Sequence, residues 1–305
     1  MRNLDKLKET LQDYGKITIL GHDNIDVDAF LSAILLSRLL NFIGIENEFI
    51  ILEKVHKNET FDIIKDMFNI DMREYQCNVE DSSRKLFLED HYSTKHKGKV
   101  IACLDHHLTS DPIVNSYLFY YCRQSCSVSY IVYELMCEAG YQICKEEAKM
   151  ILVSMMVDTV AFKSKKTVKA EVTKAKEIAK QFKLNFQEIE KCCLCLTPID
   201  KLSTEEIIEN GFKDYNYNGN KVKSSYIQVY EMLDEEVIDD WINLIVQKLK
   251  SQKLSMWVFV VFVCKDEITI EYHITSNSIN RIKTVGILSR GINIMPKIEE
   301  YFTNL

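Results

Sequence analysis

The chain has 305 residues, of which 47% are hydrophobic and 27% are charged, and this size and composition fit a globular protein with two domains of ordinary size. Its net charge of −7 argues against a general nucleic-acid binder, because neutralising the phosphates of a duplex requires a basic face. Only nine glycines and three prolines are present, which argues against a disordered or linker-dominated chain.

The first part of the sequence alternates short apolar runs with helical patterns. We expect strands at residues 16–20, 48–52, 86–88, 100–104 and 117–121, and helices at 4–14, 28–42, 127–139, 146–162 and 168–181. Continuous apolar strands alternating with helices indicate an α/β fold, in which helices cover both faces of a parallel sheet. In such sheets ligands bind at the carboxyl ends of the strands.

The pattern changes after residue 184. We expect a first domain at residues 1–184, a connector at 185–200 and a smaller, mixed α+β domain at 201–305. Within this last domain the predicted elements are helices at 204–209 and 235–249 and strands at 224–231, 255–264 and 267–274. Lys265 and Asp266 separate the last two strands, so a hairpin is expected there.

The sequence gives no sign of export or membrane insertion. Residues 1–8 alternate in charge and lack the apolar core of a signal peptide. No apolar stretch approaches the ~20 residues that a membrane-spanning helix needs. The ten cysteines are irregularly spaced, which favours reduced thiols over a disulfide framework. We therefore expect a cytoplasmic protein that does not bind membranes.

A first polar motif follows the strand at 16–20. His22, Asp26 and Asp28 lie within seven residues, and the turn can direct alternate side chains toward one point. Imidazole and carboxylate groups are ligands for hard or borderline divalent metals. The alternative is an ordinary strand-to-helix loop with N-capping acids. This motif alone leaves both interpretations open.

Two further motifs follow the next buried strands. Asp90 and His91 come after the apolar run 86–88, and the triplet Asp105-His106-His107 comes after the run 101–104. Adjacent histidines point in different directions, so one can bind a metal while the other reaches a substrate and Asp105 orients a ring. A polar loop is the alternative interpretation.

Asp158 is the most informative single residue, because it lies in an apolar helical segment that begins at Met150. A carboxylate in such a position is costly to bury without a partner. A cation is the simplest partner.

Together, these motifs resemble the DHH phosphoesterase superfamily, whose signature includes the Asp-His-His triplet. The similarity is closest to the family II, manganese-dependent inorganic pyrophosphatases, which carry a GH-x-N-P-D-x-D motif, a later Asp, the triplet, and an Asp followed by F-K-S. The corresponding segments here are residues 21–28, Asp90, 105–107, Asp158 and 162–164. Residues 288–291 resemble the Ser-Arg-Lys segment of the family's C-terminal domain, which is called DHHA2.

The resemblance implies two divalent metal ions, with manganese expected and cobalt or magnesium as alternatives. It assigns the metal ligands as follows: His22, Asp26 and Asp90 to one ion, and Asp28, Asp90, His106 and Asp158 to the other. Asp90 bridges the two ions in this arrangement.

The same resemblance implies a substrate site for a small phosphorylated compound. His107 and Asp105 are expected to have catalytic roles, with His107 near the phosphate. Lys201, Ser289 and Arg290 are expected to bind substrate. The implied reaction is hydrolysis of inorganic pyrophosphate by a hydroxide activated between two metals. The resemblance is also compatible with a homodimer.

The chain departs from the family at three positions. Ile25 and Val27 stand where the family has Pro and usually Thr, and Gly291 replaces a lysine that contacts phosphate. A charge-assisted hydrogen bond of the kind lost at 291 is worth about 1.5–3 kcal/mol. Four lysines elsewhere in the chain are candidates for partial compensation, although a solvated helix start is the favoured interpretation of most of them: Lys163, Lys165, Lys166 and Lys169.

The predicted function is therefore a metal-dependent phosphohydrolase with pyrophosphate as the leading substrate. The loss of lysine at 291 keeps two alternatives open. One is a phosphatase for short polyphosphates or small nucleotides, and the other is a weakly active regulatory protein that binds metal or nucleotide.

Overall fold

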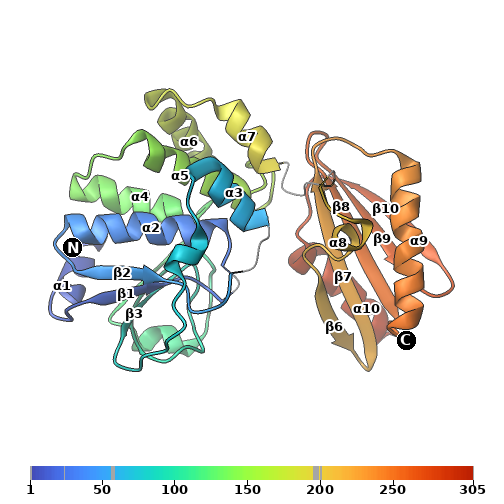
Figure 1. The fold of residues 1–305 in the computed structure, drawn as a ribbon, viewed down its shortest axis with the longest axis horizontal. Coiled ribbons are helices and arrows are strands. Elements are labelled where there is room, and N and C mark those ends of the chain that lie inside the picture. The colour runs from blue at the N-terminus through green and yellow to red at the C-terminus, as the bar shows by residue number, and fades with distance from the viewer. Residues whose placement is uncertain (1, 24, 56–58, 195–198, 200, 305) are drawn as a thin grey trace. The chain divides into compact units, whose positions relative to one another are not determined.

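The structure is a computed structural model that describes residues 2–23, 25–55, 59–194, 199 and 201–304. The chain forms two compact units (Figure 1), and each is described by itself. Unit 1 contains residues 1–162 and 166–190, and unit 2 contains residues 163–165 and 191–305. The expected connector at 185–200 is partly helical, since α7 spans Phe186–Leu194. Residues 195–198 and 200 of that connector lie outside the described residues.

Unit 1 is built on a parallel five-stranded sheet in the order β2-β1-β3-β4-β5. Its strands are β1 (Ile17–Leu20), β2 (Asn47–Ile50), β3 (Lys85–Glu89), β4 (Lys99–Asp105) and β5 (Phe119–Cys122). Its helices, besides α7, are α1 (Asn3–Leu11), α2 (Val27–Phe42), α3 (Glu59–Phe68), α4 (Val128–Ala139), α5 (Lys145–Asp158) and α6 (Lys169–Gln181), with short 3₁₀ turns at Met72–Tyr75 and Pro112–Ser116. The predicted α/β class with a parallel first sheet is confirmed.

The sheet is the core of unit 1, which explains the apolar sequence of its strands. Helices α2, α4 and α5 pack against one another, and α2 contacts β1, β2 and β3. On the other face, Leu86, Leu88 and Cys103 pack with partly buried side chains that include Tyr92 and Tyr117. Strands covered on both faces lose the alternation of polar and apolar residues, as the sequence shows.

Helix α5 ends at Asp158, four residues before the predicted end at 162. Val160, Ala161 and Phe162 all have positive φ, between 50° and 65°, so the chain turns sharply away from the helix. The Thr159 hydroxyl stabilises this turn by accepting a hydrogen bond from the amide of Phe162 at 2.9 Å. The sequence 159–162 contains no Gly or Pro that would signal such a break.

Unit 2 contains a mixed five-stranded sheet in the order β10-β9-β8-β7-β6, with β7 and β8 parallel and the other pairs antiparallel. Its strands are β6 (Lys213–Tyr217), β7 (Asn220–Val229), β8 (Met256–Val263), β9 (Ile268–Ile274) and β10 (Ile279–Val285). Its helices are α8 (Thr204–Ile208), α9 (Glu235–Ser251) and α10 (Met295–Thr303), with a π-helical turn at Arg290–Ile294. The mixed α+β prediction and the β8–β9 hairpin are confirmed.

The strands β6 and β10 were not predicted. Both lie at the edges of the second sheet and are largely exposed, so their sequences carry polar residues instead of an apolar run. The core of unit 2 lies between the sheet and α9, where Trp257 and Phe259 pack with Ile245.

Two expectations about the chain as a whole can be compared with the structure. Within the described ranges, no helix combines the length and the apolar character that crossing a membrane requires. The cysteines of those ranges carry free thiols.

The sheet of unit 2 allows a matched test of core packing. Ile270 in β9 is fully buried, whereas Ile279 in β10 is 53% exposed. We expect Ile270→Ala to lower the free energy of unfolding by about 2–5 kcal/mol because it leaves a cavity. Ile279→Ala should change it by no more than about 0.5 kcal/mol. Urea unfolding followed by tryptophan fluorescence reports on this unit, since Trp241 and Trp257 both lie in it. Equal losses for the two variants would contradict the described packing.

Candidate metal centre

Three neighbouring strands of the first sheet end at the same edge and present His and Asp side chains there. His22 follows β1, Asp90 follows β3 and His106 follows β4. Two groups of potential ligand atoms each lie within 4.8 Å of one another: His22, Asp26 and Asp90 in one, and Asp90, His106 and His107 in the other. Asp90 belongs to both groups, so the sequence motifs meet at this carboxylate.

Asp90 is buried among other acids. Its residue is only 3% exposed, and its backbone is held in the left-handed region with φ of 65°. Burial raises the pKa of this carboxyl well above its usual range, and the carboxylates of Asp28, Asp26 and Asp158 raise it further. Oδ1 accepts no hydrogen bond from any group that the structure describes. A buried carboxylate in this state is stabilised by a cation.

His22 and Asp26 form one side of the cluster. His22 Nε2 lies 3.4 Å from Asp26 Oδ2 and 3.7 Å from Asp90 Oδ2. Burial lowers the pKa of His22, but the contact with Asp26 outweighs it and the net pKa is raised. Asp26 is also the N-cap of α2, because its side chain accepts a hydrogen bond from the amide of Ala29 at 3.0 Å. The capping and metal-binding interpretations of this motif are therefore compatible at Asp26.

His106 is oriented by the backbone. Its Nδ1 lies 3.1 Å from the carbonyl oxygen of Ser125, which can only accept, so Nδ1 carries the proton. Nε2 then presents its lone pair toward the carboxylates, 3.2 Å from Asp90 Oδ1 and 3.8 Å from Asp158 Oδ2. A histidine whose other nitrogen donates to a carbonyl is the usual form of a metal ligand.

Asp105 organises the triplet without entering either group. It is fully buried, and its Oδ1 accepts hydrogen bonds from the amides of His106 at 2.7 Å and His107 at 3.0 Å. The same oxygen lies 2.9 Å from Nδ1 of His107. This contact fixes the imidazole of His107, whose side chain is 50% exposed, and leaves its Nε2 for other contacts.

Asp28 lies outside both groups of close ligand atoms, although the resemblance places it on the second metal. Its buried carboxylate accepts hydrogen bonds from the amides of Val128 at 2.7 Å and Ser129 at 3.1 Å, at the start of α4. The hydroxyls of Ser129 and Ser154 donate to it as well. Burial raises the pKa of Asp28. In this structure the residue links α2, α4 and α5.

Asp158 is the last residue of α5, and its side chain is 14% exposed. Its partner is the ammonium of Lys166, at 3.1 Å from Oδ1, and His106 lies on its other side. A lysine of the same unit therefore supplies a positive charge beside this aspartate.

The three residues expected to bind substrate lie in unit 2. Lys201 is exposed and precedes α8. Ser289 caps the turn that starts at Arg290, accepting a hydrogen bond from the amide of Ile292 at 3.3 Å. The guanidinium of Arg290 lies over the ring of Tyr226 at 5.0 Å.

Arg290 is also held by the backbone. Its Nη1 donates to the carbonyl oxygens of Gly211 and, at 3.2 Å, Ser224. Burial lowers the pKa of Arg290. These contacts fix one nitrogen of the guanidinium.

Sequence reasoning missed Glu89, which directly precedes Asp90. It is fully buried, and burial together with the charge of Asp28 raises its pKa well above the usual range. The signal in the sequence was the alternation of side-chain direction along β3. Leu86 and Leu88 face one side of the sheet, so Glu89 must share the opposite, covered face with Phe87.

Another set of potential ligands lies beside the first motif. Asp23, Glu53 and His96 bring one ligand atom each within 4.8 Å of one another. Lys95 already pairs with Asp23 at 3.1 Å and with Glu53 at 2.6 Å. The two carboxylates of this set therefore already share a positively charged partner, unlike the Asp90 carboxylate.

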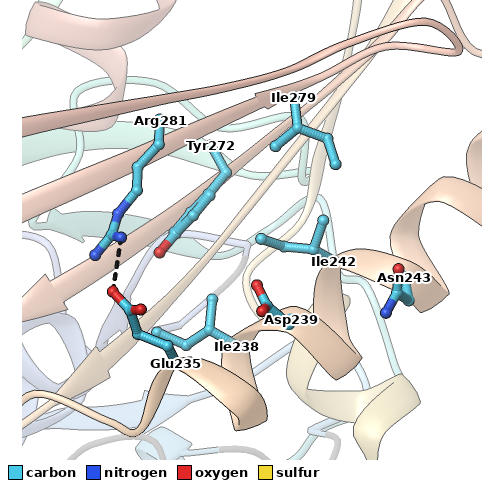
Figure 2. A pocket seen from close by; sticks show the side chains of 8 residues that line it. All are labelled: Glu235, Ile238, Asp239, Ile242, Asn243, Tyr272, Ile279 and Arg281. Carbon is cyan, nitrogen blue, oxygen red and sulfur yellow. Dashed lines mark hydrogen bonds and ion pairs between the residues drawn. The ribbon is translucent and has the colours of Figure 1, made fainter.

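Unit 2 contains a cavity of ≈ 330 Å³ between α9 and the strands β9 and β10. Figure 2 shows Ile238, Ile242 and Ile279 beside Tyr272, with Arg281 paired to Glu235 at 3.1 Å. None of the residues expected to bind substrate lines this cavity.

Comparison with known proteins finds similarity to a family in the first unit. Residues 16–162 match the DHH family, N-terminal domain, which confirms the resemblance seen in the motifs. A manganese-dependent inorganic pyrophosphatase of Methanocaldococcus jannaschii is 27% identical over 265 residues, covering 80% of this chain and 81% of that protein. A probable manganese-dependent inorganic pyrophosphatase of Streptococcus thermophilus is 26% identical over 258 residues, covering 81% and 82%.

Solved structures support the fold. The structure of a putative family II inorganic pyrophosphatase from Methanococcus jannaschii superposes with a TM-score of 0.64 at 24% identity, covering 94% of this chain and 99% of that one. An exopolyphosphatase-related protein from Bacteroides fragilis gives a TM-score of 0.53 at 15% identity, covering 99% and 96%. At these identities the similarity concerns the fold alone.

The raised pKa of Asp90 predicts how metal-free protein responds to Asp90→Asn. The folded protein binds this proton more readily than the unfolded chain, so stability is lost as the pH rises from the ordinary value of 3.8 toward the folded-state pKa. At neutral pH we expect the metal-free variant to be more stable than wild type by about 1–3 kcal/mol. Manganese should stabilise only the wild type.

Scanning calorimetry in chelator and then in Mn²⁺ measures both effects. Asp13→Asn, at an exposed position, is the control and should behave as wild type. A less stable metal-free Asp90→Asn protein at pH 7 would show that the carboxylate is not strained by its neighbours.

Proposed function

We propose that this chain, whose residues 16–162 match the DHH family, is a metal-dependent phosphohydrolase that cleaves inorganic pyrophosphate to phosphate. The observation that carries the proposal is the position of Asp90, which is shared by two groups of ligand atoms at the edge of the sheet. The names of the relatives in Methanocaldococcus and Streptococcus support manganese and pyrophosphate.

The residues of the cluster fit divalent metal ions. Asp90 Oδ1 and His106 Nε2 are both buried, and neither has a hydrogen-bond partner in the described part of the chain. Manganese, cobalt and magnesium all bind carboxylate oxygens, and they differ in how readily they bind imidazole nitrogens as well. Under the proposal His22, Asp26 and Asp90 hold one ion. Those proposed to hold the second ion are Asp28, Asp90, His106 and Asp158.

Divalent cations in these positions would lower the pKa of water and withdraw charge from the phosphoryl oxygens. The chain's own groups then have separate tasks. Asp90 holds both positions together, since its two oxygens face His22 and His106. Asp105 holds the triplet in place through its three contacts. His107, fixed through Nδ1, directs the exposed part of its ring toward a substrate oxygen.

We also propose that Lys201, Ser289 and Arg290 contribute phosphate contacts. Arg290 is the strongest of the three, because its guanidinium is already oriented by Tyr226 and two carbonyl oxygens. A guanidinium that is fixed in advance loses less conformational entropy when it binds a phosphoryl group.

One observation favours a second candidate substrate class. Gly291 has no side chain that could place a cation beside Arg290. Apart from its two chain neighbours and the backbone of its own helical turn, no heavy atom of the described residues lies within 4 Å of where its Cβ would be. Pyrophosphate is small and highly charged, so it should lose more from a missing cation than a larger phosphate ester would. A short polyphosphate or a small nucleotide is therefore the alternative substrate. A weakly active regulatory protein that binds metal or nucleotide is the alternative if turnover is low.

The setting of this activity is part of the proposal. We place it in the cytoplasm, with a small phosphorylated substrate and without membrane or general nucleic-acid binding. The net charge of −7 supports the last point. A homodimer is compatible with the proposal.

Activity assays test the substrate and the role of Asp90. We expect purified protein with Mn²⁺ to release phosphate from pyrophosphate faster than from tripolyphosphate or small nucleotides. Asp90→Ala should remove essentially all metal-dependent turnover, because both ligand groups lose their shared member. Asp13→Ala is the control at an exposed position. Release from nucleotides alone would support the alternative substrate, and near-normal turnover by Asp90→Ala would contradict the proposed centre.

The role of Asp105 can be tested separately. Asp105→Asn puts an amide where a buried carboxylate accepts three hydrogen bonds, so we expect kcat at saturating Mn²⁺ to fall by about 10–100-fold. Asp111→Asn lies in the following loop at an exposed position and should leave kcat unchanged. If both variants keep the wild-type kcat, Asp105 does not orient a functional group.

A further inference from the structure

The turn after α5 returns a lysine to the metal centre. Val160, Ala161 and Phe162 adopt left-handed conformations, and the chain then approaches the end of α5 again. Lys166 Nζ lies 3.1 Å from Oδ1 and 3.4 Å from Oδ2 of Asp158. Asp158 and Lys166 both belong to unit 1, so their ion pair lies within that unit. Residues 163–165, which lie between them in the sequence, are assigned to unit 2.

Other carboxylates of the acidic cluster also affect the pKa of Lys166. Burial lowers the pKa of its ammonium, but Asp158 raises it, followed by Asp90 and Asp26, and the net pKa is raised. On the other side of the carboxylate, His106 Nε2 lies 3.8 Å from Asp158 Oδ2. The ammonium therefore occupies the field of the same carboxylates that would attract a divalent ion.

The two proposed metal positions differ in how free their ligands are. In the first, Asp26 and Asp90 contact the imidazole of His22, and a metal can take the place of these contacts. In the second, Asp158 is engaged by an ammonium, and the oxygens of Asp28 accept four hydrogen bonds from α4 and Ser154. A second ion must displace the ammonium before it can reach Asp158.

We infer that Lys166 is a resident cation that competes with the second divalent ion for Asp158, so that the centre binds one ion tightly and the other weakly. The inference rests on the proposed function and adds a form of regulation to it, because full occupancy then depends on the metal concentration. A lysine suits this role, since its ammonium is a compact charge on a flexible stem. The side chain of Lys166 is 43% exposed, so it can move to solvent when a metal displaces it.

Metal titration tests the inference without any substrate. Mn²⁺ is added to metal-free full-length protein at pH 7.5. Isothermal titration calorimetry measures the heat of binding, and electron paramagnetic resonance measures the concentration of unbound Mn²⁺; together they give the affinity and the stoichiometry. We expect one tight and one weak equivalent for wild type. Lys166→Met should increase the affinity for the weakly bound ion by at least about tenfold, because it removes the positive charge that competes with the ion for the Asp158 carboxylate. The tight equivalent should change less, since Asp158 is not among its ligands.

Two further variants make the result specific. Lys166→Arg keeps a positive charge and should keep the second equivalent weak. Lys165→Met removes an adjacent, exposed charge and should behave as wild type. A matching increase in Lys165→Met would show a general electrostatic effect and overturn the competition.

The remaining outcomes separate this inference from the proposed function. Two equally tight equivalents in wild type, unchanged in Lys166→Met, would overturn the inference and leave the proposed function standing. An unchanged metal titration with weaker pyrophosphate binding in Lys166→Met would make the lysine a substrate contact and also overturn it. Failure of wild type to bind Mn²⁺ at all would instead overturn the proposed function.

Discussion

The structure depends on one electrostatic constraint, which is the burial of the Asp90 carboxylate among other acids at the edge of a parallel sheet. Asp26, Asp28 and Asp158 all raise the pKa of this group, in addition to burial. Such an arrangement is unfavourable unless positive charge is supplied. The surrounding residues are best understood by how they supply that charge or leave a place for it. His22 and His106 offer nitrogen ligands, and Lys166 offers an ammonium.

The fold holds this constraint in place. The parallel order of β1, β3 and β4 brings the ends of three strands together, although their sequences are separated by dozens of residues. The left-handed backbone of Asp90 and its amide, which donates to Leu104 at 3.0 Å, fix the carboxylate relative to β4. Strain of this kind persists where the surrounding packing determines the conformation. The core therefore determines the geometry of the acids, and the acids determine the need for cations.

Much of this could be predicted from the sequence, because strand ends in a parallel sheet converge. That rule, with the DHH resemblance, brought His22, Asp26, Asp90 and His106 to one place. It could not predict that the carboxylate of Asp28 lies against the start of α4, since that contact depends on how three helices pack. Nor could it predict the position of Lys166, which follows from three left-handed residues in a turn without glycine.

The same limits apply outside the cluster. Arg290 was expected to bind phosphate, and its contacts to Gly211, which precedes β6, and to Ser224 in β7 depend on how the fold brings distant segments of the chain together. The edge strands β6 and β10 could not be predicted from apolar runs, because their exposed sequences contain none. Tertiary contacts decide these features, and a single sequence does not encode them in a local pattern.

The central claim is that Asp90 is shared between two metal positions. Anomalous diffraction at the manganese edge from crystals grown with excess Mn²⁺ tests it most directly. The account predicts two anomalous peaks, one beside His22 and Asp26 and one beside His106, both within bonding distance of an Asp90 oxygen. Peaks that avoid Asp90, for example one held by Asp23, Glu53 and His96 alone, would contradict it.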